Sequence, residues 1–320
     1  MKRAAVFVIY HKDGLIDRSV DYYLSQLKAY TSRIVIVVNG KLAEQGKKAL
    51  SPYSEEIIVR ENTGYDVAAY QTGIRAIGYE VLKEYDELWV INDSVFGPVY
   101  PLEQMLTAME KRPNLSLWGV TGHRCMKEMR LPDNPCGYME AHIQSYFTAY
   151  RKSLLLDRCF EEYWENLPLV QNRQQAIDRH ETYATYYFAQ HGFSWDCYVP
   201  MAENSNTEDM LHMEALRALQ EFRCPFLKKN LFSVKSPAPA MLQNIRIFVT
   251  EQTGYDFSIV TDTAMQKLST EEKIAAIQAL AVQPTPEMRA AKKLYDWRMG
   301  VKRVLKKSRL VRAIWQKIKN

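Results

Sequence analysis

The chain has 320 residues, of which 47% are apolar and 25% are charged, and this composition excludes an intrinsically disordered chain. No run approaches the roughly 20 uninterrupted apolar residues of a bilayer-spanning helix, so an integral membrane protein is not expected. The formal charge of +5 is uneven, because residues 289–320 hold twelve Lys or Arg and one acidic residue, a net +11 that leaves −6 on the other 288 residues. A mildly acidic body with a strongly basic end predicts an anionic partner for that end.

The first 100 residues alternate between strand-like and helical segments. Met1 to Tyr10 resembles the start of a signal peptide, but a charged turn ends its apolar run, so we interpret it as a first strand. Strands are expected at residues 6–10, 34–38, 56–59 and 87–91, and helices at residues 17–30 and 66–77. This β-α-β-α-β order predicts an α/β fold with a doubly wound, mainly parallel sheet and flanking helices.

The elements after residue 100 are shorter and less regular. Strands are expected at 115–120 and 143–150, helices at 154–166, 175–190 and 270–280, and a short basic segment at 225–232, whereas residues 236–262 show no clear period. These features divide the chain into a main domain at 1–235, an irregular and helical extension at 236–285, and a basic tail at 286–320.

The five cysteines are scattered along the chain without a C-x-x-C pair. An odd count without metal-type spacing predicts neither a disulfide framework nor a structural zinc site. We therefore expect isolated thiols in a reducing compartment, for which the cytoplasm is the natural choice.

The polar residues that follow the predicted strands are the first candidates for binding, because ligands of doubly wound sheets lie at the carboxyl ends of the strands. These residues are His11, Lys12, Asn39, Asn62, Asp66, Asn92 and Asp93.

Four short motifs extend this pattern: Glu61-Asn-Thr-Gly-Tyr-Asp66, Asn92-Asp-Ser-Val-Phe-Gly-Pro98, Trp118-Gly119 and Gln144-Ser-Tyr-Phe147. Each is weak alone, but their order and spacing resemble the rhamnan synthesis F family of cell-surface polysaccharide enzymes over about residues 6–232. The resemblance implies a GT-A-like fold and a glycosyltransferase with a nucleotide-sugar donor, often dTDP-L-rhamnose. It also implies a lipid-linked glycan as the acceptor.

The turn Asn92-Asp93-Ser94 corresponds to the metal-binding position of such enzymes. Sugar transfer expels a diphosphate, and the negative charge that grows on this leaving group needs a countercharge. Asp93, flanked by neutral oxygen ligands on Asn92 and Ser94, would hold Mg²⁺ or Mn²⁺ against the phosphates. A plain Asn-Asp turn after a strand would look the same in the sequence.

The resemblance places Asn62, Gly64 and Asp66 beside the nucleoside of the donor. The Asp66 carboxylate is a strong acceptor for ribose or base, and a helix N-cap is the alternative role for it. Gly64 would supply a positive φ or allow a ligand to approach closely.

Further residues would contact the phosphates and the acceptor. His11 and Lys12 follow the first strand, and Lys228 or the lysine after it follows Pro225, so all of them are candidates for phosphate binding; solvated loop charges are the alternative. Gln144 and Ser145 would face the acceptor, or else form hydrogen bonds within the sheet.

An inverting transfer needs a base that takes the proton of the acceptor hydroxyl. The resemblance assigns this role to Glu181, near the start of a helix, with Asp178 as the next candidate. A glutamate in a first helical turn is also favoured by the helix dipole alone. His180 is a second candidate metal ligand, although a lone histidine is also compatible with a structural role.

Residues 301–318 have the pattern of a basic amphipathic helix that contains Trp315. Such helices lie in the interface of anionic membranes, where each basic residue adds about 1 kcal/mol. We expect a cytoplasmic protein held peripherally on the inner face of the cell membrane by residues 289–320, with a helix that docks on protein as the alternative. Nucleic acid is not an expected partner, since no recognition motif is present and the body is acidic.

Two other functions fit the same residues. One is a transferase for another sugar, such as galactose or galactofuranose. The other is a non-catalytic glycan- or nucleotide-binding module of a polysaccharide assembly complex, because Asp93 is a single carboxylate where many relatives have two.

Overall fold

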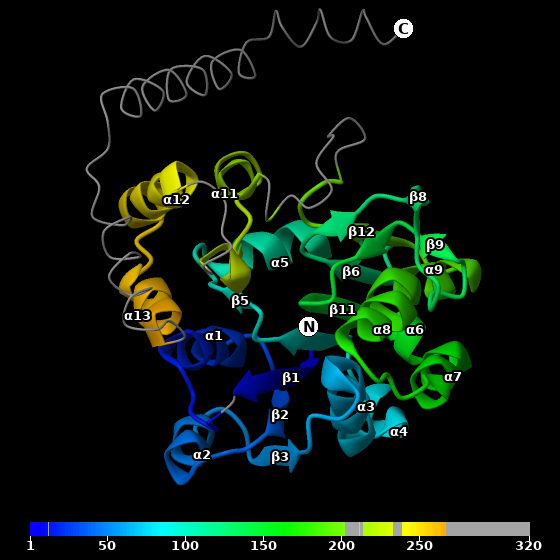
Figure 1. Cartoon of the computed structure of the whole chain (residues 1–320). Helices are drawn as coiled ribbons and strands as arrows, with labels where there is room; N and C mark the ends of the chain where they lie inside the picture. The colour runs from blue at the N-terminus through cyan, green and yellow to red at the C-terminus, as the bar shows by residue number, and fades with distance from the viewer. Residues whose placement is uncertain (12, 202–210, 212–213, 233–238, 267–320) are drawn as a thin grey trace, which may run out of the picture.

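A seven-stranded mixed sheet forms the centre of the protein, seen here in a computed structural model (Figure 1). The structure describes residues 1–11, 13–201, 211, 214–232 and 239–266. The strands of the sheet, in spatial order, are β12 (Trp195–Cys197), β6 (Leu117–Gly119), β11 (Phe147–Arg151), β4 (Glu87–Asn92), β1 (Arg3–His11), β2 (Arg33–Gly40) and β3 (Glu56–Arg60).

The direction of the strands confirms the predicted fold class. Strands β1, β2, β3 and β4 run parallel, and β12 runs parallel to β6. Strand β11 is antiparallel to both of its neighbours, β4 and β6. With helices on both faces, this is a doubly wound, mainly parallel α/β fold.

Helices cover both faces of the sheet (Figure 1). They are α1 (Arg18–Lys28), α2 (Glu44–Leu50), α3 (Tyr65–Ile77), α4 (Tyr79–Leu82), α5 (Leu102–Glu110), α6 (Lys152–Leu155), α7 (Arg158–Asn166), α8 (Arg173–Ala176), a π-helix (Ile177–Glu181) and α9 (Thr182–Gln190). After the residues that are not described come α11 (Ala215–Phe222), a 3₁₀ turn (Lys229–Phe232), α12 (Pro239–Gln252) and α13 (Ser258–Gln266).

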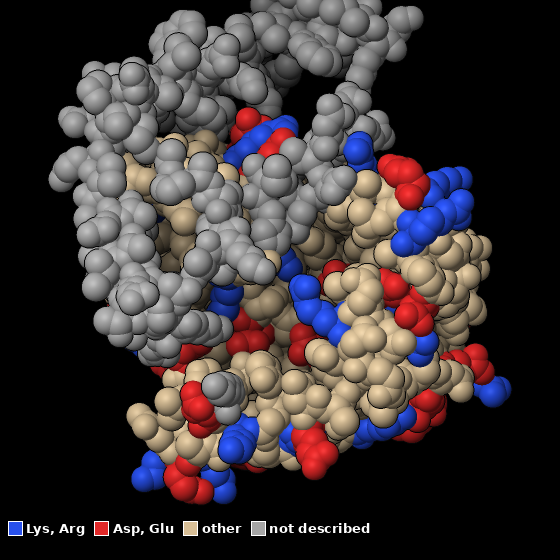
Figure 2. All heavy atoms as spheres, in the orientation of Figure 1, with Lys and Arg blue, Asp and Glu red and all other residues tan. Residues whose placement is uncertain are grey.

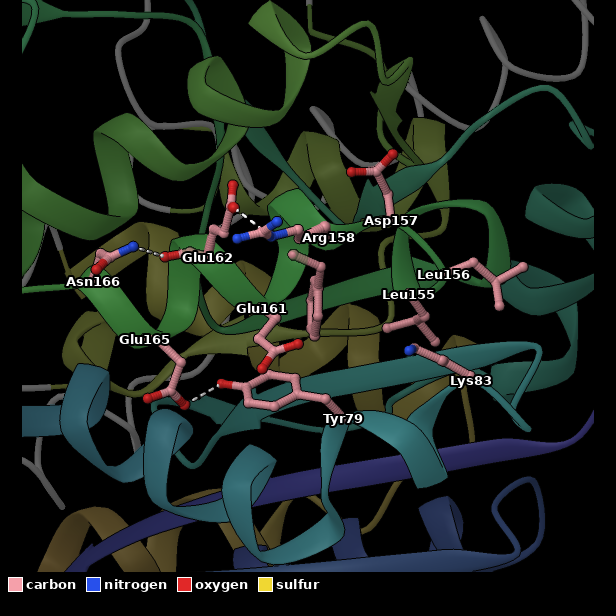
Figure 3. Close-up of a pocket in the computed structure, with 11 residues that line it drawn as sticks. Tyr79, Lys83, Leu155, Leu156, Asp157, Arg158, Glu161, Glu162, Glu165 and Asn166 are labelled. Atoms are coloured by element: carbon pink, nitrogen blue, oxygen red, sulfur yellow. Dashed lines mark hydrogen bonds and ion pairs between the residues drawn. The ribbon is translucent and has the colours of Figure 1, made fainter.

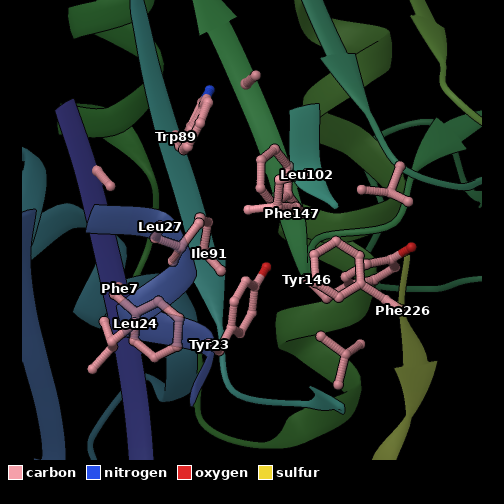
Figure 4. Packing of buried hydrophobic residues seen from close by; sticks show 14 of the residues in the cluster. Phe7, Tyr23, Leu24, Leu27, Trp89, Ile91, Leu102, Tyr146, Phe147 and Phe226 are labelled. Carbon is pink, nitrogen blue, oxygen red and sulfur yellow. The ribbon is translucent and has the colours of Figure 1, made fainter. Parts of the chain in front are cut away.

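Alternating side chains of β1 build two cores, one on each face of the sheet. Phe7 and Ile9 belong to the core shared with α1 and α5, where the Phe7 and Tyr23 rings meet edge to face at 5.3 Å (Figure 4). Val6 belongs to the opposite core, shared with α3 and α7. A Cβ on Gly73 of α3 would lie 2.3 Å from Val6, so glycine lets this helix lie directly on the sheet.

Three short ribbons lie beside the central sheet. They are β5 (Val95–Phe96) with β13 (Leu227–Lys228), β7 (Gly122–His123) with β10 (His142–Ile143), and β8 (Met126–Arg130) with β9 (Tyr138–Met139). The sequence predicted a single strand at 143–150, but two strands form, because the chain leaves β10 and turns at 144–146 before it enters the sheet as β11.

The segment without clear periodicity forms the helices α12 and α13. They pack on a third core that includes Phe96 and Leu227 of the main domain. Arg18 of α1 donates hydrogen bonds to Asp256 and Asp262, which anchors α13 against α1. The predicted helix at 270–280 and the basic tail lie outside the described residues, and within the described part no helix is long and apolar enough to cross a membrane.

A buried network of ion pairs lies at the amino end of β4. The Glu87 side chain, 1% exposed, accepts hydrogen bonds from Arg3 and Trp89 at one oxygen and from Arg151 and Trp118 at the other, at 3.0–3.1 Å. All four acceptor positions of this carboxylate are therefore filled by fixed donors.

Candidate functional site

Charged residues that the sequence singled out lie together at the carboxyl ends of strands β1 and β4. Strands β1 and β4 are parallel, with Val8 beside Asn92, so the polar residues after each strand meet at one edge. Acidic and basic side chains lie together in the hollow at the centre of the face shown in Figure 2.

The loop before α3 ends in a glycine with a positive φ. Gly64, with φ of +75°, is the N-cap of α3, and Tyr65 follows with φ of +53°. A Cβ on Gly64 would lie 2.6 Å from both Ala68 and Leu169. The positive φ predicted for Gly64 is confirmed, and Asp66 lies in the first turn of α3 rather than at its N-cap.

Asp66 lies beside the end of β4, where its surroundings disfavour the ionised form. Asn92 donates through Nδ2 to Asp66 at 3.3 Å and to the Tyr70 hydroxyl at 2.9 Å. Burial, together with the charges of Asp93 and Glu181, raises the pKa of Asp66 to about 7. The ionised form of Asp66 is therefore disfavoured first by burial and then by the two neighbouring carboxylates.

The Asn92–Ser94 turn has a defined geometry. Asn92 Oδ1 accepts from the Ser94 backbone at 3.0 Å, and the Asp93 backbone donates to Val8 at 3.1 Å. The turn is thus an Asx turn, as the simpler interpretation expected, and it also directs the Asp93 carboxylate outward, where its side chain is 20% exposed.

Two lysines from a distant part of the sequence lie near this turn. Lys228 pairs with Val95 in the β13–β5 ribbon, and the Lys229 backbone donates to Ser94 at 2.9 Å. Lys228 Nζ lies 4.6 Å from the centroid of the Tyr146 ring. Lys229, the second of the two lysines that the sequence offered, forms the contact with Asp93, at 3.6 Å from Nζ to Oδ2.

Glu181 closes the site from the side of α9. It is the last residue of the π-helix and the N-cap of α9, and π-turns of this kind are frequent at functional sites. Its Oε2 accepts from the backbone of Ser145 at 3.1 Å and from the Ser145 hydroxyl. Burial favours its neutral form, but the charges of Lys228 and His142 and the two Ser145 donors outweigh burial and lower the pKa of Glu181. The residue is therefore ionised at neutral pH.

The other predicted acceptor-side and metal residues have structural partners. Gln144 is buried and its Oε1 accepts from Thr121 at 2.6 Å. His180 is buried against the rings of Tyr163 and Trp164, and its Nδ1 pairs with the Tyr163 hydroxyl at 2.9 Å. Burial lowers the pKa of His180 to about 4, so the ring is neutral.

Residues near the nucleoside side of the site are more open. Asn62 is exposed in the loop after β3. His11, at the end of β1, accepts at Nδ1 from the backbones of Asp13 and Leu15 at 3.2 and 3.3 Å. Lys12 lies outside the described residues.

The sequence missed two arginines at this edge. Arg60, the last residue of β3, donates to Asn39 at 2.6 Å and to the Thr63 carbonyl at 2.7 Å, and burial lowers its pKa. Arg173, at the start of α8, carries a charge that opposes the rise in the pKa of Asp66. The position of Arg60 directly after a predicted strand was the signal that could have identified it.

The charges around the turn do not fit the predicted metal site, because the Lys229 ammonium already lies beside Asp93. Magnesium needs one or two carboxylates besides the substrate phosphates. Asp93 is the sole carboxylate of its turn, Asn92 Oδ1 is engaged with Ser94, and the Lys229 ammonium lies beside Asp93. Within the described ranges, no three His, Cys, Asp or Glu side chains are grouped so that they could hold an ion, and His180 has the partners given above.

A second hollow, of about 410 Å³, lies at the other edge of the sheet (Figure 3). It is lined by residues of α4, α6 and α7, including Tyr79, Lys83 and Glu165. Because α6 begins where β11 ends, beside the amino end of β4, this hollow is separate from the candidate site.

The strand order, with a charged turn at the carboxyl ends of the strands, makes this a doubly wound α/β protein whose candidate site lies at those strand ends. The profile of a family described as rhamnan synthesis protein F matches residues 34–293. The chain belongs to this family. The family resemblance derived from the four sequence motifs is thereby confirmed.

One curated relative and several solved structures are similar to the chain. The relative, the uncharacterized protein y4gN of Sinorhizobium fredii, is 29% identical over 189 residues; the match covers 59% of this chain and 46% of that protein, so the chain spans about half the length of this relative.

Among solved structures, core-mannan synthase A from Aspergillus fumigatus in its Mn/GDP form has 10% identity and a TM-score of 0.35 over 60% of this chain and 72% of that one. The mannosyltransferase PcManGT from Pyrobaculum calidifontis, in complex with GDP-Man and Mn²⁺, has 11% identity and a TM-score of 0.36 over 95% and 88%. Likeness at this distance concerns the fold alone.

Proposed function

We propose that the protein transfers a sugar, L-rhamnose from dTDP-L-rhamnose, to a growing lipid-linked cell-surface polysaccharide. The observation that carries the proposal is the ionised Glu181 carboxylate, held by Ser145 and by the charge of Lys228 at the edge where ligands of this fold bind. The family description supports the choice of rhamnose, since a rhamnan is a polymer of that sugar.

Glu181 acts as the general base in this proposal. Its carboxylate takes the proton of the acceptor hydroxyl while that oxygen attacks the anomeric carbon from the side opposite the diphosphate. The bond from the anomeric carbon to the phosphate oxygen breaks, and its electron pair leaves on the diphosphate. The configuration at the anomeric carbon is therefore inverted.

Residues on the other side of the turn orient the donor. Asp66 and Asn62 lie in and beside the first turn of α3 and are assigned to the nucleoside, with Arg60 next to them. His11 and Lys228 are assigned to the phosphates, since they flank the ends of β1 and β4. An acceptor would then approach past Ser145, which belongs to the same loop as Gln144.

The assay that tests this function measures release of nucleoside diphosphate and transfer to a rhamnose-terminated acceptor from a panel of sugar nucleotides. Glu181→Gln is expected to reduce transfer by roughly 10²–10⁴ while donor binding persists, because the amide cannot take a proton. The matched control is Glu165→Gln on α7, in the second hollow. Transfer by Glu181→Gln at the wild-type rate would assign the base elsewhere, with Asp178 next, and a preference for another donor would replace rhamnose.

The proposal extends to the membrane, where a lipid-linked acceptor resides. The +11 charge and the apolar residues of the tail at 289–320 support attachment to the cytoplasmic face of the cell membrane. Removal of residues 288–320 should release the protein from anionic liposomes but leave turnover of a soluble acceptor nearly unchanged, because the proposed site lies before Leu231. Co-sedimentation at low salt decides this point: a full-length chain that stays in the supernatant contradicts it.

A further inference from the structure

Two consecutive lysines at the end of β13 interact with different carboxylates. The charge of Lys228 acts on Glu181, and its ammonium lies over the Tyr146 ring. Lys229 Nζ lies 3.4 Å from Oδ2 of Asp17 and 3.6 Å from Oδ2 of Asp93. The two ammonium groups therefore have different neighbours, and only that of Lys229 contacts the Asn92–Ser94 turn.

Lys229 is held in place by its surroundings. Its side chain is 11% exposed, its ammonium lies 5.6 Å from the centroid of the Phe96 ring, and its backbone is bonded to Ser94. Asp17, whose side chain is 4% exposed, is itself fixed as the N-cap of α1 by the backbone of Val20. A mostly buried ammonium between two carboxylates is costly to move, because each charge would lose its partner.

A divalent cation bound to Oδ2 of Asp93 would lie close to this ammonium, which is 3.6 Å from the same oxygen. Two cations within a few ångströms repel each other strongly in a partly buried site. A lysine has three N–H donors, so Lys229 can hold both carboxylates and still offer a third donor to a phosphate. Its charge is also present before the donor arrives, which is the condition for stabilising a leaving group without reorganisation.

We propose that Lys229 takes the place of the divalent cation: its ammonium, positioned by Asp93 and Asp17, binds the diphosphate of the donor, and the protein transfers sugar without a metal ion. This inference rests on the proposed function. As the bond between the anomeric carbon and the phosphate oxygen breaks, the electron pair goes to the diphosphate, Lys229 and Lys228 balance that charge, and Glu181 keeps the proton of the acceptor. No further reactant is required.

The test compares dTDP binding and sugar transfer by the full chain in EDTA and in Mn²⁺. The wild-type protein is expected to bind dTDP with the same affinity in both buffers. Lys229→Gln is expected to weaken binding by at least about tenfold and to reduce turnover by roughly 10²–10³, as loss of one electrostatic stabiliser does. Lys229→Arg, which keeps the charge, should stay within about tenfold of wild type. Lys83→Gln in the second hollow is the matched control and should match wild type throughout.

The outcomes separate this inference from the function it rests on. Binding that requires Mn²⁺ in the wild type and is unchanged in Lys229→Gln overturns the role of Lys229 and leaves the transferase function standing. Failure of dTDP and of UDP to bind in either buffer overturns both. If Lys229→Gln does not fold, the EDTA comparison on the wild type and the Lys229→Arg variant still decide the matter.

Discussion

The carboxylates at the two ends of β4 have opposite surroundings. At the amino end, Glu87 accepts from two arginines and two tryptophans, and every acceptor position is filled. At the carboxyl end, burial first, and then the charges of Asp93 and Glu181, raise the pKa of Asp66 to about 7. The saturated network around Glu87 fixes the sheet, whereas perturbed carboxylates such as Asp66 are typical of functional sites.

The comparison is tested most strongly by removing Glu87. Glu87→Ala leaves the buried guanidinium of Arg151 without a carboxylate and leaves Arg3 with Glu110 as its remaining carboxylate partner. We expect a loss of about 3–5 kcal/mol in the free energy of unfolding, as for other broken buried ion pairs. Urea unfolding measures the loss. Glu84→Ala, which removes an exposed partner of Lys2, is the control and should cost less than about 1 kcal/mol. Equal losses in the two variants would contradict the structural role of the network.

A smaller effect is expected at the open end when Ser145 loses its hydroxyl. Ser145→Ala removes one of the donors that lower the pKa of Glu181, so this pKa should rise. Because the base acts only when ionised, the acid limb of the kcat/KM profile should move to higher pH. Activity on that limb should fall by about tenfold, the cost of losing one hydrogen bond to a charged group. Activity above the new pKa should change little, and an unshifted acid limb would separate Ser145 from the base. The exposed Ser51→Ala is the control.

The smallest effect concerns Asp66 and the pH dependence of stability. The folded protein holds a proton on Asp66 up to a pKa of about 7, whereas the unfolded chain releases it near the ordinary value of 3.8. Stability should therefore fall as pH rises from about 4 to 7, since the folded state binds more protons in this range. Asp66→Asn should remove this slope and gain on the order of 1 kcal/mol at pH 8, given that solvent partly screens the group. Unfolding curves at pH 5 and 8 would show it; an identical slope in both proteins would contradict the raised pKa of Asp66.

The sequence predicted the parts of the molecule that depend on local pattern. The β-branched run from Ile34 to Val38 gave the strand β2, and the alternation of strands and helices gave the parallel half of the sheet. Gly64 was identified from its place in the Glu61–Asp66 motif, and glycine adopts the positive φ found there without steric cost. The split of the 143–150 segment was missed, because the turn at 144–146 depends on Glu181 and Thr121, which lie far away in the chain.

The partners of the charged site residues could not be predicted from the sequence for the same reason, because they lie far apart in the chain. Nothing near Asp93 in the sequence announces a lysine, and the contact with Lys229 spans more than a hundred residues. His180 looked like a metal ligand because its aromatic partner Tyr163 is brought to it only by the packing of α7 on the π-helix. The sequence therefore named candidate residues of both charges, and only the tertiary structure showed that Lys229 lies beside Asp93.

The β13–β5 ribbon has a consequence for how the site comes into being on the ribosome. A chain that has been synthesised only as far as Cys224 already contains all three carboxylates but neither lysine. Gly97 leaves room for no side chain beside the Pro225 carbonyl, which would lie 2.4 Å from a Cβ, so the late segment must dock closely onto an early one. The acidic edge therefore carries its full repulsion until residues 225–229 arrive. A fragment that ends before them would also lack the buried side chains of Phe226 and Leu227, so any shortened version of the protein has to retain this segment.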